Sequence, residues 1–257
     1  MGPSPLGGRS PTEAGGGAPS TPSAGGNRSF VDLHVHTSAS FDSLASPSSV
    51  VRAAAARGLS HIAVTDHDRI DGGLAARDVA RADAPGLTVI VGQEVMTRDG
   101  DLICAFLERS IPSGLSALEA IAAAREQGAV VGIPHPFDRF RGSLLLVLDA
   151  LAEFASLVDW VEVHNARVMI GSGNERAALF AREHDLPGVA VSDAHAAMEI
   201  GVAYAAVDGD PSTPAGLLAA LRSAELVTGR ATVFVRAVTP VAKLVQRARG
   251  KGRAAVR

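Results

Sequence analysis

The sequence is short of cysteine, aromatic residues and long apolar runs, and each shortage counts against a class of protein. Its single cysteine, Cys104, excludes a disulfide within the chain. No apolar run approaches the ~20 residues that a membrane-spanning helix requires. Aromatic residues are only 4% of the sequence, which leaves few rings for stacking on nucleic-acid bases. We therefore expect a cytoplasmic protein without a membrane partner.

The bulk composition fits one folded domain. Hydrophobic residues make up 47% of the 257 residues, enough for a sizeable core, and the length suits a single α/β barrel. The net charge of −3 indicates neither a nucleic-acid partner nor a membrane surface. Cys104 lies in the apolar stretch 102–107, where we expect it to be a small buried core residue.

The two ends differ from the rest of the chain. Residues 1–28 are rich in Gly, Pro and Ser, so we expect a disordered tail that is not a secretory signal. We expect the barrel domain to span 29–238, and 239–257 to form a helix followed by a basic tail. The cations of this tail could contact phosphate backbones, although a solvated helix end is the favoured interpretation. These cations are Lys243, Arg247, Arg249, Lys251, Arg253 and Arg257.

Between the ends, short β-branched runs alternate with alanine-rich stretches. Ser46-Pro47 and Thr213-Pro214 are typical of helix starts. The alternation predicts an α/β fold with a mostly parallel sheet and right-handed crossovers, and seven or so units favour closure into a barrel. We expect strands near 30–36, 60–65, 87–95, 101–107, 129–133, 158–164, 188–192, 202–207 and 231–236. We expect helices near 47–57, 72–83, 115–127, 143–156, 173–185, 213–224 and 239–249.

The first expected strand carries a pair of histidines. Its two-residue alternation puts Asp32, His34 and His36 on one face, opposite three apolar side chains. Residues two apart on a strand point the same way, about 7 Å from each other. The two imidazoles can therefore converge on one metal ion.

Polar side chains recur where later strands end, as expected for an active site at the carboxyl face of a barrel. Imidazoles and carboxylates without thiolates suit Zn, Mn or Fe. So many candidate ligands imply at least two ions, which a carboxylate such as Glu94 can bridge. The residues are Asp66, His67, Asp68, Glu94, His135, Glu162, His164, Asn165, Asp193 and His195.

Taken together, these motifs resemble the PHP family of polymerase and histidinol phosphatase domains. The resemblance runs from about residue 30 to 207. It implies a single-domain, distorted (β/α)7 TIM-like barrel with a phosphoesterase site of two or three divalent ions. The matching motifs are Asp32-Leu33-His34-Val35-His36-Thr37, Thr65-Asp66-His67-Asp68, Gly92-Gln93-Glu94, His135-Pro136-Phe137 and Ser192-Asp193-Ala194-His195.

The resemblance also implies how the ligands divide among the ions. Glu94 would bridge the first and second ions. The first group is His34 and His36 with Asp193 alongside, the second contains His135, and another is Asp42, His67 and His195.

One position departs from the family pattern. Many members have a further histidine on the strand after the glutamate, but this sequence has none between His67 and His135. We expect Asp101 to take its place. A carboxylate there would shift the metal preference toward harder ions such as Mn or Mg. Without Asp101, the second site would lack a ligand or be completed by water.

Further polar residues are expected around the ligands. Asp66 and Glu162 could orient an imidazole, and Asn165 is expected beside them. The planar fork of arginine matches a phosphate group, so we expect three arginines that follow strand ends to bind the substrate phosphate. They are Arg139, Arg141 and Arg167.

The sequence thus predicts a phosphoesterase that hydrolyses a phosphate monoester or nucleotide phosphate with metal-activated water, Glu94 bridging the ions. Three alternatives stay open: a 5′–3′ exonuclease acting on short oligonucleotides, a histidinol-phosphate phosphatase, and a non-catalytic metal-binding regulatory module. An amidohydrolase-type barrel is less consistent, because no lysine occupies a candidate strand end. The expected partner is a small phosphorylated substrate, with a nucleotide or oligonucleotide end among the options.

Overall fold

The computed structural model describes residues 28–138, 141, 143–144, 154–168, 172–231 and 238–252. Within these ranges one sheet of nine strands has the order β7-β6-β5-β4-β3-β2-β1-β8-β9. The strands are β1 (Arg28–Val35), β2 (His61–Val64), β3 (Thr88–Met96), β4 (Asp101–Ala105), β5 (Val130–Ile133), β6 (Trp160–Asn165), β7 (Gly188–Val191), β8 (Tyr204–Asp208) and β9 (Glu225–Val227). The helices are α1 (Pro47–Ala56), α2 (Asp71–Asp83), α3 (Ala117–Arg125), α5 (Gly173–Glu183), the 3-10 turn η2 (Ala197–Glu199), α6 (Pro214–Leu221) and α8 (Val238–Ala248).

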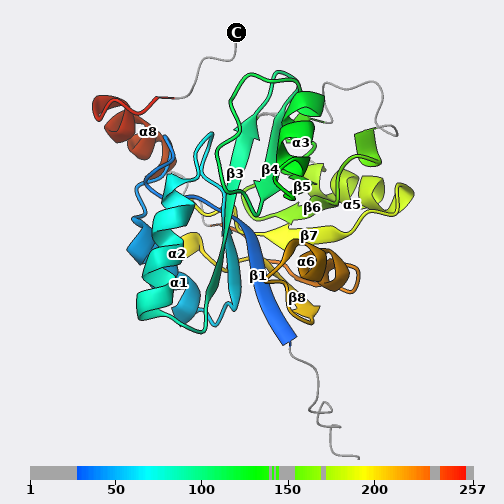
Figure 1. The fold of residues 1–257 in the computed structure, drawn as a ribbon, viewed down its shortest axis with the longest axis horizontal. Helices are drawn as coiled ribbons and strands as arrows, with labels where there is room; N and C mark the ends of the chain where they lie inside the picture. The colour runs from blue at the N-terminus through cyan, green and yellow to red at the C-terminus, as the bar shows by residue number, and fades with distance from the viewer. Residues whose placement is uncertain are drawn as a thin grey trace, which may run out of the picture.

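The sheet curls into a nearly closed barrel. Strands β1, β2 and β3 are parallel, as are β5, β6 and β7, and β4 lies antiparallel between the two sets. A parallel bridge between Val35 and Ala194 joins the ends of β1 and β7, and the amide of His36 donates to the carbonyl of Ala194 at 2.9 Å. Helices α1 and α2 cover one side of this barrel and α3 and α5 the other (Figure 1). The predicted distorted (β/α)7 barrel is confirmed, with β4 reversed between β3 and β5 and β8 antiparallel to β1.

The helix starts follow the sequence signals. The side chain of Ser46 accepts the Ser49 amide at α1, and Thr213 accepts the Gly216 amide at α6, each followed by a proline. Ser116 and Glu119 form a capping box at α3. These side chains satisfy amides that the first helical turn leaves without a partner.

The apolar core of the barrel lies directly below a polar end. Ile90, Ile103 and Trp160 are buried in one cluster at the base. Because strand side chains alternate, the same strand faces carry polar groups further up. On β3 this polar group is Glu94, on β6 it is Glu162, and on the reversed strand β4 it is the first residue, Asp101. Reversal of β4 therefore brings the start of that strand to the carboxyl end of its neighbours.

Close packing at the base depends on one glycine. A Cβ added to Gly132 on β5 would lie 2.1 Å from the Trp160 ring on β6. The indole fills the space that any other residue at position 132 would need, which fixes how closely these two strands approach.

One predicted helix differs from the structure, one strand was not predicted, and two predicted elements lie mostly outside the described residues. The expected helix 213–224 ends at Leu221, and the strand that was not predicted, β9, follows it. All three residues of β9 are exposed, so no buried alternation marks it in the sequence. The expected helix 143–156 and strand 231–236 fall largely outside the described ranges. None of the described helices is both long and apolar enough to cross a membrane.

We predict that Cys104 does not react with thiol reagents in the native protein. The side chain is fully buried in β4, and burial raises the pKa of its thiol to about 12. Only the thiolate is an effective nucleophile, so an aromatic disulfide reagent at about pH 8 should label the thiol only after denaturation. Rapid stoichiometric labelling of the folded protein would contradict this burial.

Candidate metal centre

A cavity of about 90 Å³ lies at the carboxyl end of the barrel strands. Most of its walls are residues that the sequence predicted as metal ligands, and the two others, His34 and His36, are fully buried beside it. The lining residues are Phe41, Asp42, His67, Glu94, Asp101, His135, Arg141, Asp193, His195 and Lys243. The structure therefore brings all nine predicted ligands into one place.

The first group of ligands gathers around the end of β1. His34 Nε2 lies 2.9 Å from His36 Nε2 and 3.1 Å from Glu94 Oε2, and His36 Nε2 lies 3.3 Å from the same oxygen. Ligands bonded to one ion at roughly 2.0–2.2 Å are themselves separated by roughly 3–3.5 Å. The spacing of these three atoms thus matches that of ligands around a single ion.

His34 is oriented from its other side. Its Nδ1 lies 2.7 Å from Glu162 Oε1, while Glu162 Oε2 accepts the amide of His135 at 2.9 Å and the side-chain amide of Asn165 at 2.8 Å. A carboxylate on the far nitrogen of a histidine fixes the tautomer that offers Nε2 to a metal. Asn165 also donates to Asp193 Oδ2 at 3.0 Å, which connects β6 to the loop after β7.

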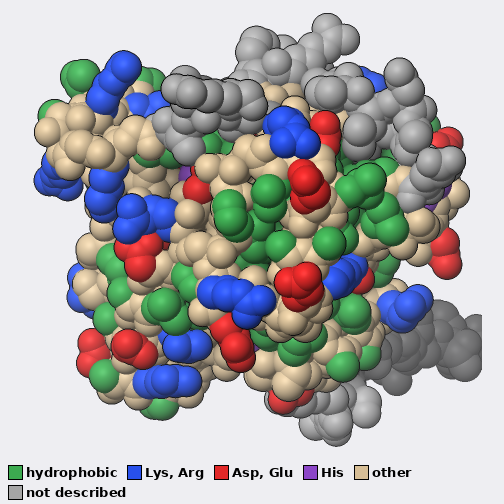
Figure 2. Space-filling model, turned by 45° about the horizontal axis from the view of Figure 1, so that its top comes forward, with side chains coloured by type: hydrophobic (Ala, Val, Ile, Leu, Met, Phe, Trp, Pro, Cys, Tyr) green, Lys and Arg blue, Asp and Glu red, His purple; other side chains and the backbone are tan. Residues whose placement is uncertain are grey.

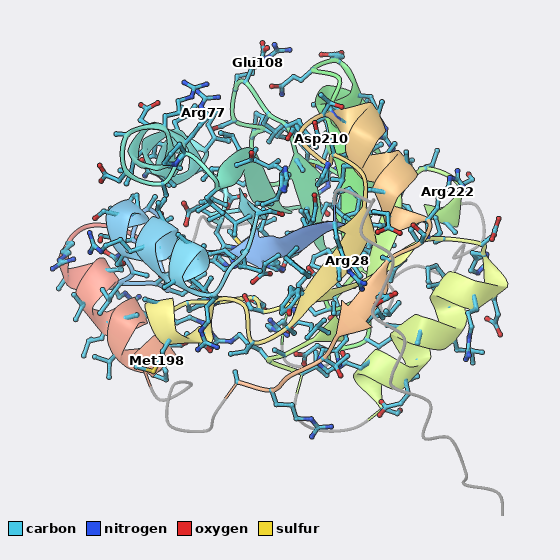
Figure 3. The ribbon with its side chains drawn as sticks, turned by 90° about the horizontal axis from the view of Figure 1, so that it is seen from below. Arg28, Arg77, Glu108, Met198, Asp210 and Arg222 are labelled. Atoms are coloured by element: carbon cyan, nitrogen blue, oxygen red, sulfur yellow. The ribbon has the colours of Figure 1, made fainter. Side chains whose placement is uncertain are left out.

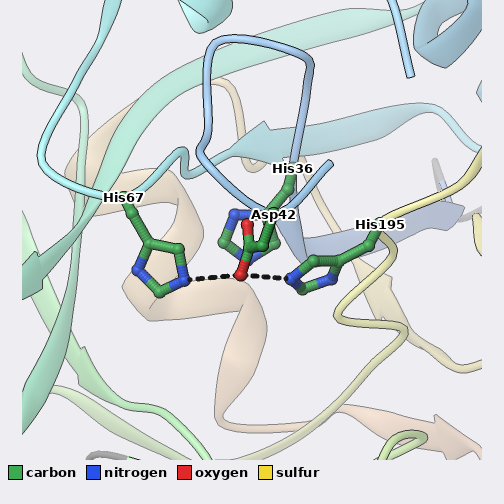
Figure 4. A group of neighbouring side chains, drawn as sticks. All are labelled: His36, Asp42, His67 and His195. Carbon is green, nitrogen blue, oxygen red and sulfur yellow. Dashed lines mark ion pairs between the residues drawn. The ribbon is translucent and has the colours of Figure 1, made fainter. Parts of the chain in front are cut away.

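A second group surrounds Asp42, which lies in the loop after β1. Its Oδ2 lies 3.2 Å from His67 Nε2 and 3.1 Å from His195 Nε2, so the carboxylate sits between two imidazoles (Figure 4). His36 completes this group. Nδ1 of His195 lies 2.9 Å from the Asp193 carbonyl, which again leaves Nε2 facing the cluster.

A third group consists of Glu94, Asp101 and His135. His135 Nε2 lies 3.0 Å from Glu94 Oε1, whereas the other oxygen of Glu94 faces His34 and His36. The two oxygens of one carboxylate thus point toward different groups, which is the arrangement that a bridging ligand needs. Asp101 is buried at the start of β4 and supplies the remaining oxygen.

The charges of the cluster depend on one another. Burial would raise the pKa of Glu94, but the imidazoles of His67 and His34 hold it well below its usual value. Burial likewise opposes ionisation of Asp42, whose pKa is nevertheless held well below normal by His195 and His67. Burial lowers the pKa of His195 to about 4, whereas Glu94 and Asp42 outweigh burial at His67 and raise its pKa to about 10. The carboxylates therefore stay anionic and require positive charge close by.

One buried oxygen provides a direct test of whether metal ions fit. Asp193 Oδ1 has no hydrogen-bond partner among the described residues, yet it lies 3.7, 3.6 and 3.5 Å from ring nitrogens of His34, His36 and His195. A buried carboxylate oxygen without a hydrogen bond is costly. A divalent ion held with the Nε2 lone pairs of His34 and His36 would satisfy this oxygen, so the residues fit Zn, Mn or Fe.

Two of the candidate ligands have strained backbones. His135 and Asp193 adopt φ angles of 30° and 52°, in the left-handed region that residues with a Cβ rarely occupy. Such conformations cost free energy and persist where the surroundings enforce them, commonly at functional sites. Both side chains line the cavity.

The other predicted polar residues divide between the site and its surroundings. Arg141 reaches the cavity and pairs with Asp193 and Asp138. Arg167 instead pairs with Glu199 at 3.2 Å and donates to Thr239 at 2.7 Å, so the structure does not bring it to the cavity. Arg139 lies outside the described residues.

Asp66 was expected to orient a histidine ring, but the structure shows it hydrogen-bonded to Thr37 instead. Both of its oxygens accept hydrogen bonds from Thr37, one from the amide at 2.6 Å and one from the hydroxyl at 2.7 Å. Since Thr37 directly follows His36, Asp66 fixes the chain next to that imidazole rather than the imidazole itself.

Two cavity residues were not singled out from the sequence. Phe41 stacks on His67 with ring centroids 4.7 Å apart, and Lys243 lies 5.6 Å from the centroid of the Phe41 ring. The only sequence signals were that Phe41 precedes Asp42 and that Lys243 belongs to the basic C-terminal stretch. Neither signal indicates that α8 folds back over the loop after β1.

The sequence pattern of the PHP domain matches residues 32–167, and a PHP-associated pattern matches residues 171–226. The chain belongs to the PHP-domain family. An uncharacterised protein of Methanocaldococcus jannaschii is 35% identical over 176 residues, which are 68% of this chain and 68% of that protein. A 5′-3′ exoribonuclease of Haemophilus influenzae is 31% identical over 119 residues, which are 42% of each chain.

Solved structures agree on the fold of this PHP-domain protein. A two-domain protein of Bacteroides vulgatus, described as containing a predicted PHP-like metal-dependent phosphoesterase, superposes with a TM-score of 0.65 at 21% identity. The match covers 80% of this chain and 66% of the Bacteroides chain. At this identity the likeness establishes the shared barrel fold.

We predict that Asp101→Ala weakens the ion held by the third group while leaving the others in place. The variant removes one of three candidate ligands, so affinity for that ion should fall at least about tenfold. Elemental analysis after desalting and calorimetric titration with Mn²⁺ measure this. Asp208→Ala, which changes an exposed aspartate at the end of β8, is the matched control. Unchanged metal content and affinity in Asp101→Ala would exclude Asp101 as a ligand.

Proposed function

We propose that the protein is a metal-dependent phosphoesterase that hydrolyses a phosphate monoester or nucleotide phosphate. The observation that carries this proposal is the meeting of three ligand groups around Glu94 in one cavity, with Arg141 and Lys243 in its wall. Two or three divalent ions would be held by the nine candidate ligands: His34, His36, Asp42, His67, Glu94, Asp101, His135, Asp193 and His195. Such ions, when bound, activate water and neutralise charge on phosphoryl oxygens.

The chain itself contributes orientation and charge. Glu162 and the Asp193 carbonyl fix the ring orientations of His34 and His195, so that both present Nε2 to the cavity. Arg141 and Lys243 bring two cations to the mouth, where a phosphate dianion would enter. Phe41 forms an apolar wall beside them and limits the access of water.

Hydrolysis of an aryl phosphate with added Mn²⁺ tests this function. We predict that His34→Ala lowers turnover by at least about 100-fold, because the variant removes a ligand and the partner of Glu162. His184→Ala, a histidine at the end of α5 that lies away from the cavity, should retain activity. Equal turnover by His34→Ala and the unaltered protein would refute metal-dependent catalysis and favour a non-catalytic metal-binding module.

A second candidate function is exonuclease action on the 5′ end of a short oligonucleotide. A neighbouring cavity of about 210 Å³ shares Phe41 and His67 with the metal centre and is lined by Arg69 and Lys251. An oligonucleotide whose 5′ end occupies the metal centre could bind its next phosphate in this second cavity. Figure 2 shows several Lys and Arg side chains on the side of the molecule that carries α8. The exoribonuclease relative supports the same candidate.

We predict that Lys243→Gln raises KM about three- to tenfold and leaves kcat nearly unchanged, because an exposed cation at the mouth contributes to binding of the phosphate in both ground and transition states. Steady-state kinetics with a nucleoside monophosphate and with a 5′-phosphorylated oligonucleotide measure the effect. Arg249→Gln, which removes an exposed charge from the same basic stretch, should leave both constants unchanged. Equal KM values for Lys243→Gln and the unaltered protein would remove Lys243 from the binding site.

A further inference from the structure

We infer that Gln246 on α8 is a positioning residue that holds the loop carrying Asp42, and thereby controls the ion bound by Asp42, His67 and His195. This inference rests on the proposed metal-dependent function. In Figure 1, α8 lies over the segment between β1 and α1, so the end of the chain covers a loop near its beginning. Seen from below in Figure 3, α8 again lies beside α1.

Gln246 is almost completely buried, at 1% exposure, although its helix is otherwise largely exposed. Its side-chain amide donates to three backbone carbonyls of the loop, those of Ser38 at 2.9 Å, Ser40 at 3.1 Å and Ser43 at 2.8 Å. Lys251 adds a further donor to the Ser38 carbonyl at 2.7 Å. The amide nitrogen, which carries two hydrogens, is thus shared among three carbonyls that bracket Asp42.

The same loop is attached to the metal centre from inside. The Ser40 hydroxyl donates to Asp42 Oδ1 at 2.7 Å, and the Ser43 hydroxyl donates to the His195 carbonyl at 2.9 Å. Asp42 is therefore held between these inner contacts and the outer contact with Gln246. Without the amide, the Ser40 and Ser43 carbonyls would lose this donor while Ser38 would keep Lys251, and the loop would move to recover hydrogen bonds. Movement of the loop carries the Asp42 carboxylate away from His67 and His195.

Helix α8 lies outside both matched family patterns, which end at residues 167 and 226. The contact with Gln246 is thus a feature of this chain that the family motifs do not include. It links metal occupancy at the barrel mouth to docking of the C-terminal helix.

The test compares Gln246→Met, which keeps the length of the side chain and removes the amide, with Asp42→Ala. Both variants should lose about one equivalent of bound metal, as measured by elemental analysis after desalting. In Gln246→Met the Mn²⁺ concentration for half-maximal hydrolysis should rise roughly 10- to 100-fold, with kcat recovered at saturating Mn²⁺. Arg247→Gln alters the exposed neighbour of Gln246 and should match the unaltered protein in both measurements.

A second measurement separates this role from general destabilisation. Hydrogen exchange of the metal-free protein should become faster in residues 38–43 of Gln246→Met and stay unchanged in the barrel strands. If Gln246→Met fails to fold, Gln246→Asn, which keeps the amide on a shorter side chain, takes its place in both measurements. Unaltered metal content, Mn²⁺ dependence and loop exchange would overturn the inference while leaving the phosphoesterase proposal intact. Absence of metal binding by the unaltered protein would overturn both.

Discussion

A buried carboxylate surrounded by imidazoles is the constraint on which the site depends. Glu94 is only 2% exposed, and ring nitrogens of His34, His36, His67 and His135 lie 3.0–3.4 Å from its two oxygens. A buried anion is tolerated only where positive charge and hydrogen-bond donors surround it. Protonated imidazoles can supply that charge in the absence of metal, and divalent ions would supply it more fully. The geometry around Glu94 therefore suits exchange of protons for ions at an unchanged scaffold.

The scaffold achieves this by closing a sheet so that strand ends from distant parts of the sequence meet. The bridge between Val35 and Ala194 brings the end of β1 beside the end of β7, and only then do His36 and His195 share Asp42. Reversal of β4 is the second requirement, because in a parallel orientation Asp101 would lie at the opposite end of the barrel from Glu94. The polar cluster is thus a consequence of topology and of the two-residue period of the strands.

The sequence was sufficient to predict the barrel and the nine residues that gather at its mouth. A short apolar run indicates a strand, and a His, Asp or Glu near its end indicates a candidate ligand. It was not sufficient for features that depend on long-range packing. Arg167 follows a strand end as Arg141 does, but its guanidinium pairs with Glu199 from the turn after β7 and so does not line the cavity. Lys243 reaches the cavity because α8 packs against the loop after β1, and no local pattern encodes that contact.

The position of α8 has a consequence for how the site forms. Candidate ligands run from His34 to His195, and the loop of Asp42 is completed by Gln246, so the cluster assembles only when nearly the whole described chain has folded. On the proposed metal-binding function, binding of ions favours the state that contains the complete site, which would couple metal affinity to docking of α8. The contact between Gln246 and the Asp42 loop would then affect one proposed ion without altering the strands that carry the other candidate ligands. Glu94 and its histidines provide a rigid base, and the Asp42 loop provides the adjustable edge.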